Sequence, residues 1–348
     1  MKRSLLAILL LAGFMHTQAQ STGYNSTARW STFALQSPET SPEPVSDTCL
    51  VFVSNRHVMT DSLRFVDESL DTAALKYFFL QKQEGQWKVY KAATLGEAMK
   101  SLPGRKDIVV YAEGMGKTFT ANVERARLMS AQYNVHVVMF DYASINSTYK
   151  PAKNFRFARG NARGSAAQYL SLLKEFQRAR VNNADWISGR KLSTFYHSMG
   201  NIILEKMVEE HDISSINTTP FIDNLVLNAA CVPMKRHSEW LEKIKFAKQI
   251  YVHYNATDLQ LKGAHLLTMK RQLGEKITKR QRAENAVYIN FHDMAGFQHS
   301  YFMNFPYNEY RLTPAMVDYF SKLFTGQDIS PQEAITLLTT RSTATSRM

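Results

Sequence analysis

The stretch Leu192-Ser-Thr-Phe-Tyr-His-Ser-Met-Gly-Asn201 indicates the fold, because it passes from a strand into a helix around one serine. A β-rich run ends at Tyr196, and apolar residues at helical spacing begin at Ile202. A serine on such a sharp turn exposes its hydroxyl beside the free N–H groups of a helix N-terminus, which can stabilise an oxyanion. Ser198 is therefore a candidate nucleophile. Taken alone, the motif leaves open a serine that caps an ordinary helix.

Outward from this stretch, short apolar runs alternate with helical patterns. Strands that alternate with helices favour a mostly parallel sheet covered by helices on both faces. We expect one α/β domain over residues 48–326 and a C-terminal helix and tail over residues 327–348. Eight runs predict the strands of an eight-stranded sheet: they are Cys49 to Val53, Trp87 to Tyr90, Ile108 to Tyr111, Val135 to Phe140, Leu192 to Tyr196, Leu225 to Leu227, Ile250 to Tyr254 and Val287 to Phe291.

The first 19 residues have the pattern of a signal peptide. Lys2-Arg3 precedes an apolar run from Leu5 to Phe14, and Thr17-Gln-Ala19 supplies small residues at both positions that specify cleavage. We therefore expect an exported chain, periplasmic or extracellular, without a transmembrane segment after cleavage. Residues 20–47 are rich in Ser, Thr and Pro and predict a flexible leader.

The chain is basic, with a formal net charge of +12 that cleavage would lower to +10. Such an excess favours a weak attraction to anionic surfaces and helps solubility. The densest basic stretch, residues 270–282, contains almost no aromatic side chains, unlike a surface that stacks single-stranded nucleic acid. A solvated face is the favoured interpretation, and no nucleic-acid partner is expected.

Two cysteines, Cys49 and Cys231, fall at the ends of predicted buried strands. Two buried thiols are the favoured interpretation, and a disulfide in an oxidising compartment stays open. A disulfide framework is excluded by the count alone.

Two further polar residues follow later strands of the predicted sheet. Asp258 comes after the strand that ends at Tyr254, and His299 lies in the loop after the last strand. Ligands of parallel sheets collect at the carboxyl ends of strands, and the order serine, aspartate, histidine is that of the α/β-hydrolase triad. His299 would remove the Ser198 proton, and Asp258 would hold the histidine tautomer. Taken alone, Asp258 is better explained as a turn aspartate, and a single loop histidine indicates little.

Five short segments carry a family resemblance: Val51-Phe-Val-Ser-Asn-Arg56, Val110-Tyr-Ala-Glu-Gly114, Phe140-Asp-Tyr-Ala-Ser144, His197-Ser-Met-Gly-Asn201 and His299-Ser-Tyr301. Together they resemble the bacterial α/β hydrolases formerly grouped as a domain of unknown function, number 900. The resemblance covers roughly residues 49–303, and the segment around Ser198 is its most specific part. It implies an α/β-hydrolase fold, a serine triad and hydrolysis of an acyl group.

The chain departs from this family at two positions. Members usually have His-Gly where this chain has Glu113-Gly114. The backbone N–H of Met115 can still serve an oxyanion hole together with that of Met199. A carboxylate there would weaken catalysis or select cationic substrates. The second departure is Tyr196, two residues before the serine, where a small residue normally relieves crowding.

Two competing motifs are incomplete. Gly114-Met-Gly-Lys-Thr118 follows a strand, as a phosphate-binding loop does, but that pattern needs a glycine where Tyr111 stands. Four residues that could converge as metal ligands lack the spacing of a zinc site: they are His253, His292, Asp293 and His299. No cofactor and no metal are expected.

These observations favour an exported serine hydrolase that cleaves a carboxylic ester, or less favourably an amide, through an acyl-serine intermediate. The expected partner is a small-molecule or lipid-like ester. The alternative is a binding or surface-associated protein that keeps the fold without turnover, because folds do not fix function. Glu113, Tyr196 and the positive charge motivate this alternative.

Overall fold

The computed structural model describes residues 23–42, 48–304 and 312–340. This part of the chain forms two compact units, one ending at Arg190 and the other beginning at Lys191. The single domain expected over residues 48–326 stays a prediction. No helix within these residues is long and apolar enough to cross a membrane. The predicted signal peptide, residues 1–19, lies outside the described residues.

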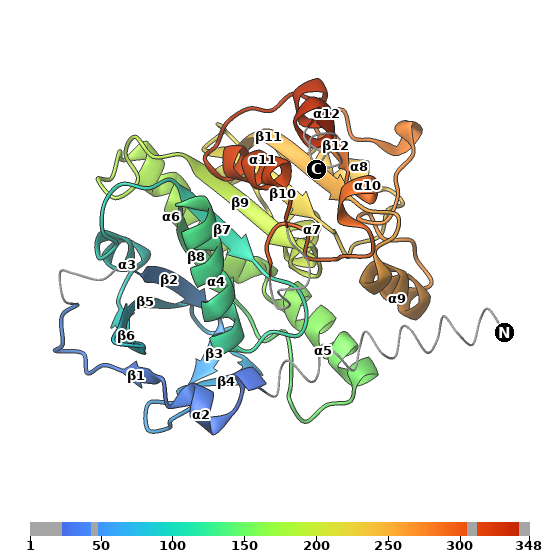
Figure 1. Cartoon of the computed structure of the whole chain (residues 1–348). Helices are drawn as coiled ribbons and strands as arrows, with labels where there is room; N and C mark the ends of the chain where they lie inside the picture. Colours follow the sequence, from blue (N-terminus) through green and yellow to red (C-terminus); the bar gives the residue numbers. More distant parts are fainter. Residues whose placement is uncertain (1–22, 43–47, 305–311, 341–348) are drawn as a thin grey trace, which may run out of the picture. The chain divides into compact units, whose positions relative to one another are not determined.

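The N-terminal unit contains a mixed sheet with the strand order β1-β6-β5-β2-β8-β7 (Figure 1). Strands β2, β8 and β7 are parallel, whereas β5 is antiparallel to both β2 and β6. The central strands are buried along their whole length, which is why they read as continuous apolar runs. The strand bounds are β1 (Phe33–Leu35), β2 (Cys49–Ser54), β5 (Lys76–Gln83), β6 (Gln86–Ala92), β7 (Ile108–Ala112) and β8 (His136–Asp141), with a separate antiparallel pair of β3 (Arg56–Val58) and β4 (Val66–Leu70).

A tight hairpin joins β5 to β6 through Glu84 and Gly85. Their φ angles are 48° and 83°, and positive φ at both central residues defines the turn that matches the twist of an antiparallel pair. The sequence did not predict β5, because its apolar centre is short and its ends are polar. The Glu-Gly pair was the local signal available for this hairpin.

Part of the stretch expected to be a flexible leader belongs to the fold. Residues Thr27–Trp30 form helix α2, and Phe33–Leu35 form β1, which pairs in parallel with β6. Trp30 is 2% exposed and stacks on Phe119 with ring centroids 6.0 Å apart. Aromatic contacts of this kind are worth roughly 0.5–1.5 kcal/mol each beyond the buried area. The contact of Trp30 with Phe119 therefore orders a segment whose average composition indicates disorder.

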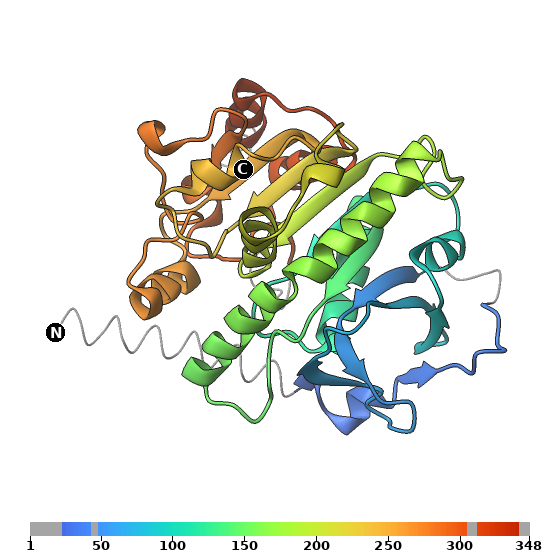
Figure 2. The same ribbon diagram turned by 180° about the vertical axis from the view of Figure 1, so that it is seen from behind.

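Helices cover both faces of the N-terminal sheet. On one face Phe52 of β2 contacts Phe119 of α4, with ring centroids 5.2 Å apart. On the other face Phe140 of β8 contacts Tyr169 of α6 at 4.9 Å. Figure 1 shows α4 in front of the strands, and Figure 2, from behind, shows α5 and α6. The helices are α3 (Leu95–Lys100), α4 (Phe119–Tyr133), α5 (Pro151–Gly164) and α6 (Ala166–Val181).

The C-terminal unit contains four parallel strands among its described residues, in the order β9-β10-β11-β12. Phe195 of β9 packs against Phe324 of α11, with ring centroids 5.1 Å apart. The strands are β9 (Leu192–His197), β10 (Ile222–Asn228), β11 (Ala247–Tyr254) and β12 (Val287–Asn290). The helices are α7 (Gly200–Glu210), α8 (His237–Leu241), α9 (Leu259–Thr268), α10 (His292–Ala295), α11 (Pro314–Phe324) and α12 (Pro331–Thr340), with 3-10 turns at Ser214–Ile216 and Lys279–Gln281.

The predicted fold class, a mostly parallel sheet with helices on both faces, is confirmed. The predicted count of eight strands is wrong. Across the described ranges, and apart from the separate pair β3-β4, the two units contribute ten strands, of which β1 and β5 were not predicted. β1 has three residues and β5 has polar ends, so neither forms a continuous apolar run in the sequence.

Candidate active site

Ser198 lies on the sharp turn between β9 and α7. Its φ is +52°, in the left-handed region that residues other than glycine rarely occupy. Main-chain hydrogen bonds hold this conformation: Ser198 N–H donates to Asn228 O at 3.0 Å, and Ser198 O accepts from Cys231 N–H at 3.1 Å. Strained backbone of this kind persists only where the surroundings fix it, and it concentrates at functional sites.

Hydrogen bonds from the side chain of Asn201 stabilise the same turn. Its Nδ2 donates to Tyr196 O and Ser198 O, each at 3.0 Å, and to Asn228 O at 3.3 Å. Met199 is the N-cap residue of α7, at the helix end where N–H groups have no intrahelical acceptor. The N–H of Met199 is therefore of the type that can donate to an oxyanion. The motif around Ser198 did not predict this role of Asn201.

Asp258 and His299 are brought together by elements that follow β11 and β12. Asp258 caps α9 by accepting from Leu261 N–H at 3.0 Å through Oδ1. Its Oδ2 lies 2.6 Å from His299 Nδ1, and both side chains are buried. Asn255 pins the loop before His299, because its Nδ2 donates to Gly296 O and Gln298 O. A carboxylate at Nδ1 leaves Nε2 of a neutral histidine unprotonated, as a general base requires.

The structure places His299 beside the residue that precedes Ser198. The rings of His197 and His299 have centroids 4.7 Å apart. Within the described residues no hydrogen bond joins Ser198 Oγ to His299. Catalytic hydrogen bonds are often long in a free enzyme and shorten in the complex with substrate.

Three of the four residues considered as metal ligands, His253, His292 and His299, have other contacts. His253 Nε2 lies 2.8 Å from Tyr319 Oη, and His292 Nδ1 lies 3.3 Å from Thr257 Oγ1. In the described ranges no group of three His, Cys, Asp or Glu side chains is placed to hold a metal ion.

Glu113, in the N-terminal unit, has its charge compensated. Its carboxylate forms an ion pair with Arg125 and accepts from Tyr111 Oη, and its Oε1 accepts from Gly114 N–H at 2.7 Å. All three side chains are buried. The partner on α4 was not predicted, because no local pattern connects residues twelve positions apart across a loop. Because Arg125 balances the charge of Glu113, this loop carries no unbalanced negative charge from that carboxylate.

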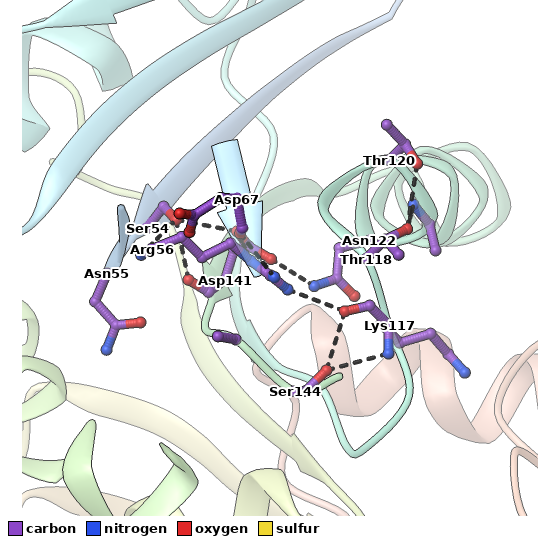
Figure 3. Close-up of polar contacts among 12 residues, drawn as sticks. Ser54, Asn55, Arg56, Asp67, Lys117, Thr118, Thr120, Asn122, Asp141 and Ser144 are labelled. Atoms are coloured by element: carbon purple, nitrogen blue, oxygen red, sulfur yellow. Dashed lines mark hydrogen bonds and ion pairs between the residues drawn. The ribbon is translucent and has the colours of Figure 1, made fainter. Parts of the chain in front are cut away.

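The loop between β7 and α4 is held by a buried ion pair (Figure 3). Arg56 Nε donates to Asp141 Oδ2 at 2.8 Å, and Asn122 Nδ2 donates to Asp141 Oδ1 at 2.7 Å. Arg56 Nη2 also donates to Lys117 O at 2.9 Å, which ties the guanidinium to the loop. The pair thus joins the start of β3 and the end of β8 to the loop that carries Met115.

The same loop does not present its N–H groups as a phosphate-binding loop would. Gly116 N–H donates to Ser144 O at 3.0 Å, and Lys117 N–H donates to Ser144 Oγ at 3.1 Å. Gly116 has a φ of +91°, which explains the glycine. Burial, and secondarily the charge of Arg125, lowers the pKa of Lys117 to about 8. The role of Met115 in an oxyanion hole stays a prediction.

The two cysteines are buried, Cys49 at the start of β2 and Cys231 three residues after β10. Burial of both thiols agrees with the favoured interpretation from the sequence.

Comparison with known proteins identifies the family. No curated protein matches the chain. A solved structure, the polyethylene-glycol-bound complex of a cold-adapted esterase from an Arctic intertidal metagenomic library, is similar with a TM-score of 0.35 and 10% identity over 73% of this chain and 96% of that one. The family model described as an alpha/beta hydrolase of unknown function, DUF900, matches residues 90–321. The chain belongs to this family of α/β hydrolases.

Proposed function

We propose that this chain is an exported serine hydrolase that cleaves a carboxylic ester through an acyl-Ser198 intermediate. The observation that carries the proposal is the 2.6 Å contact between Asp258 Oδ2 and His299 Nδ1, in the unit whose Ser198 has a φ of +52°. Membership in an α/β-hydrolase family supports hydrolase chemistry. The signal-peptide pattern of residues 1–19 supports export.

The proposed reaction follows from the proton each group carries. His299 Nε2 takes the proton of Ser198 Oγ as that oxygen attacks the carbonyl carbon, and Asp258 stabilises the imidazolium that forms. The N–H of Met199, at the N-terminus of α7, stabilises the tetrahedral oxyanion. His299 returns the proton to the departing alcohol. Water then attacks the acyl-serine by the same route and releases the acid.

Substitution of Ser198 tests the proposal. Wild-type protein should be labelled by a fluorophosphonate probe and should hydrolyse p-nitrophenyl butyrate, and Ser198→Ala should lose both, because no other proposed group forms the covalent bond. Ser238→Ala on α8 is the matched control and should keep both. Undiminished labelling of Ser198→Ala would reject the proposal. Absence of labelling in the wild type would favour a non-catalytic binding protein.

We also propose a lipid-like ester that is reached at an anionic surface, on the basis of the exposed end of α9. Leu266, Leu267 and Met269 are 52%, 48% and 85% exposed. Lys270 and Arg271 follow directly and are exposed as well. Apolar side chains bordered by cations are the pattern of helices that lie on anionic membrane surfaces. Asp258 caps the same helix, whose ten residues span about 15 Å.

A further inference from the structure

Three polar side chains stand in register across neighbouring strands of the C-terminal unit. Asn228 of β10 is the cross-strand partner of His197 on β9 and of His253 on β11. Side chains at paired positions point to the same face of a sheet. All three are at most 2% exposed, and a buried polar group is unfavourable unless it is hydrogen-bonded.

Hydrogen bonds join these side chains into a continuous chain, which we call the polar ladder: Ser300, His197, Asn228, His253 and Tyr319. Asn228 Oδ1 lies 3.0 Å from His197 Nδ1, and Asn228 Nδ2 lies 3.2 Å from His253 Nδ1. His253 Nε2 lies 2.8 Å from Tyr319 Oη, and Ser300 Oγ lies 3.3 Å from His197 Nε2.

The amide of Asn228 sets the direction of the polar ladder. Its oxygen only accepts and its nitrogen only donates. His197 therefore carries its proton on Nδ1, and His253 carries its proton on Nε2. Burial lowers the pKa of His253 to about 3, so this imidazole is neutral. If His197 is neutral as well, its Nε2 accepts from Ser300 Oγ, and each later bond is donated in the same direction, toward Tyr319.

Asn228 is connected directly to the Ser198 turn and, through His197, to the loop of His299. Its main-chain oxygen accepts from Ser198 N–H at 3.0 Å, on the nucleophile turn. Its side chain holds His197, whose ring packs on that of His299 and whose Nε2 faces Ser300, the residue after His299. One residue thus anchors the turn of the proposed nucleophile and the loop of the proposed base.

We propose that Asn228 is a positioning residue, which orients His299 and the Ser198 turn and holds His197 as the neutral Nδ1–H tautomer. The proposal rests on the proposed function. In that tautomer the unprotonated nitrogen, the negative end of the imidazole dipole, lies on the side of the His299 loop. Fixed dipoles of this orientation favour the imidazolium that forms when His299 takes the Ser198 proton. The opposite tautomer of His197 would place its N–H on that side and disfavour the His299 imidazolium.

The first test is made on the wild-type protein. Imidazole 15N chemical shifts, assigned with His197→Gln and His253→Gln, should show the Nδ1–H form for His197 and the Nε2–H form for His253. The opposite pair of tautomers would overturn the proposal. This outcome does not depend on whether Ser198 is a nucleophile.

The second test compares Asn228→Leu with Asn224→Leu. Asn224 lies on the same strand, is buried, and donates to Leu323 O and Gln327 O, so its loss has a similar structural effect away from the ladder. Asn228→Leu should slow fluorophosphonate labelling and lower kcat by about 10- to 100-fold, because small misplacement of reacting groups has effects of this size. Asn224→Leu should change labelling less than about threefold at a temperature where both variants are folded.

Asn228→Asp provides a variant of nearly unchanged shape. Its carboxylate cannot donate to His253 Nδ1, so His253 should move its proton to Nδ1 and the rate should fall, visible in the same 15N spectrum. Equal rates for wild type, Asn228→Leu and Asn228→Asp, with labelling still lost in Ser198→Ala, would overturn the positioning role alone. Labelling that survives in Ser198→Ala would reject the proposed function.

Discussion

Asp258 serves His299 and helix α9 with different oxygens of one carboxylate. Oδ2 lies 2.6 Å from His299 Nδ1, while Oδ1 accepts from Leu261 N–H at 3.0 Å. The side chain is fully buried. The capping function and the proposed catalytic function can therefore be separated by the choice of substitution.

Asp258→Asn should keep the cap and lose the activity. Asparagine caps helices as well as aspartate does, but its amide reverses the histidine tautomer, so kcat should fall on the order of 10⁴-fold. Asp258→Ala should lose the same activity and a further ~1 kcal/mol of unfolding free energy, because it removes the cap. Ester hydrolysis and urea unfolding measure the two effects. Full activity of Asp258→Asn would exclude Asp258 from the triad.

Replacement of Ser198 should reveal the strain of its backbone. A φ of +52° is unfavourable by roughly 1–2 kcal/mol for a residue with a Cβ and accessible to glycine. Ser198→Gly should therefore be more stable than Ser198→Ala by about 1 kcal/mol in urea unfolding. Ser193, earlier in β9, is the control: there glycine should be less stable than alanine by about 0.5–1 kcal/mol. Glycine less stable than alanine at both positions would contradict the strain.

The sequence predicted those parts of the site that local patterns encode. A β-rich run followed by helical spacing located Ser198, and the end of a later strand located Asp258. Their placement relative to His299 followed from a general rule of parallel sheets, that polar residues at strand ends converge at one edge. The contact of Asp258 with His299 agrees with that rule.

The residues that the sequence did not predict depend on strand register or on distant partners. Asn228 ends β10 and His253 lies near the end of β11, and their pairing, which was not predicted, follows from the register of segments far apart in sequence. The partner of Glu113 lies on the next helix. Trp30 is a single aromatic residue within a Ser- and Thr-rich segment, and composition averaged over that segment hides it.

Acid should destabilise the protein through two buried histidines. Burial lowers the pKa of His253 to about 3, and burial with the charge of Arg190 lowers that of His136 to about 4. An unfolded histidine titrates near ~6.5, so below that pH the unfolded state binds more protons than the folded state. Stability is then complete above about pH 6.5 and is lost as pH falls, by up to about 1.4 kcal/mol per pH unit for each histidine.

Urea unfolding at pH 7, 6 and 5 measures this effect. The free energy of unfolding of the wild type should decrease with falling pH. That of His136→Gln should decrease less steeply, because this variant takes up about one proton fewer on unfolding. Parallel pH dependences of the two proteins would show that His136 does not contribute.

The exposed end of α9 should bind anionic vesicles. Residues 262–282 contain seven cationic side chains and one carboxylate, that of Glu275. Glu275 is buried, and its oxygens contact His265 and the N–H of Gln272. Positive charge beside exposed apolar side chains should attract an anionic surface and weaken with salt. Ser198→Ala protein, which does not degrade the lipid, should sediment with phosphatidylcholine vesicles that contain phosphatidylglycerol and not with pure phosphatidylcholine.

Two charge variants separate a defined surface from net charge alone. A Lys or Arg near an anionic surface is worth about 1 kcal/mol, so Lys270→Gln with Arg271→Gln should lower the partition coefficient by about 30-fold. Lys243→Gln with Lys245→Gln removes the same charge from exposed positions of the same unit and should lower it less than about threefold. Equal losses would mean that the whole-molecule charge governs binding. A loss confined to the first pair would assign binding to the end of the helix that Asp258 caps, which would favour a substrate reached at the lipid surface.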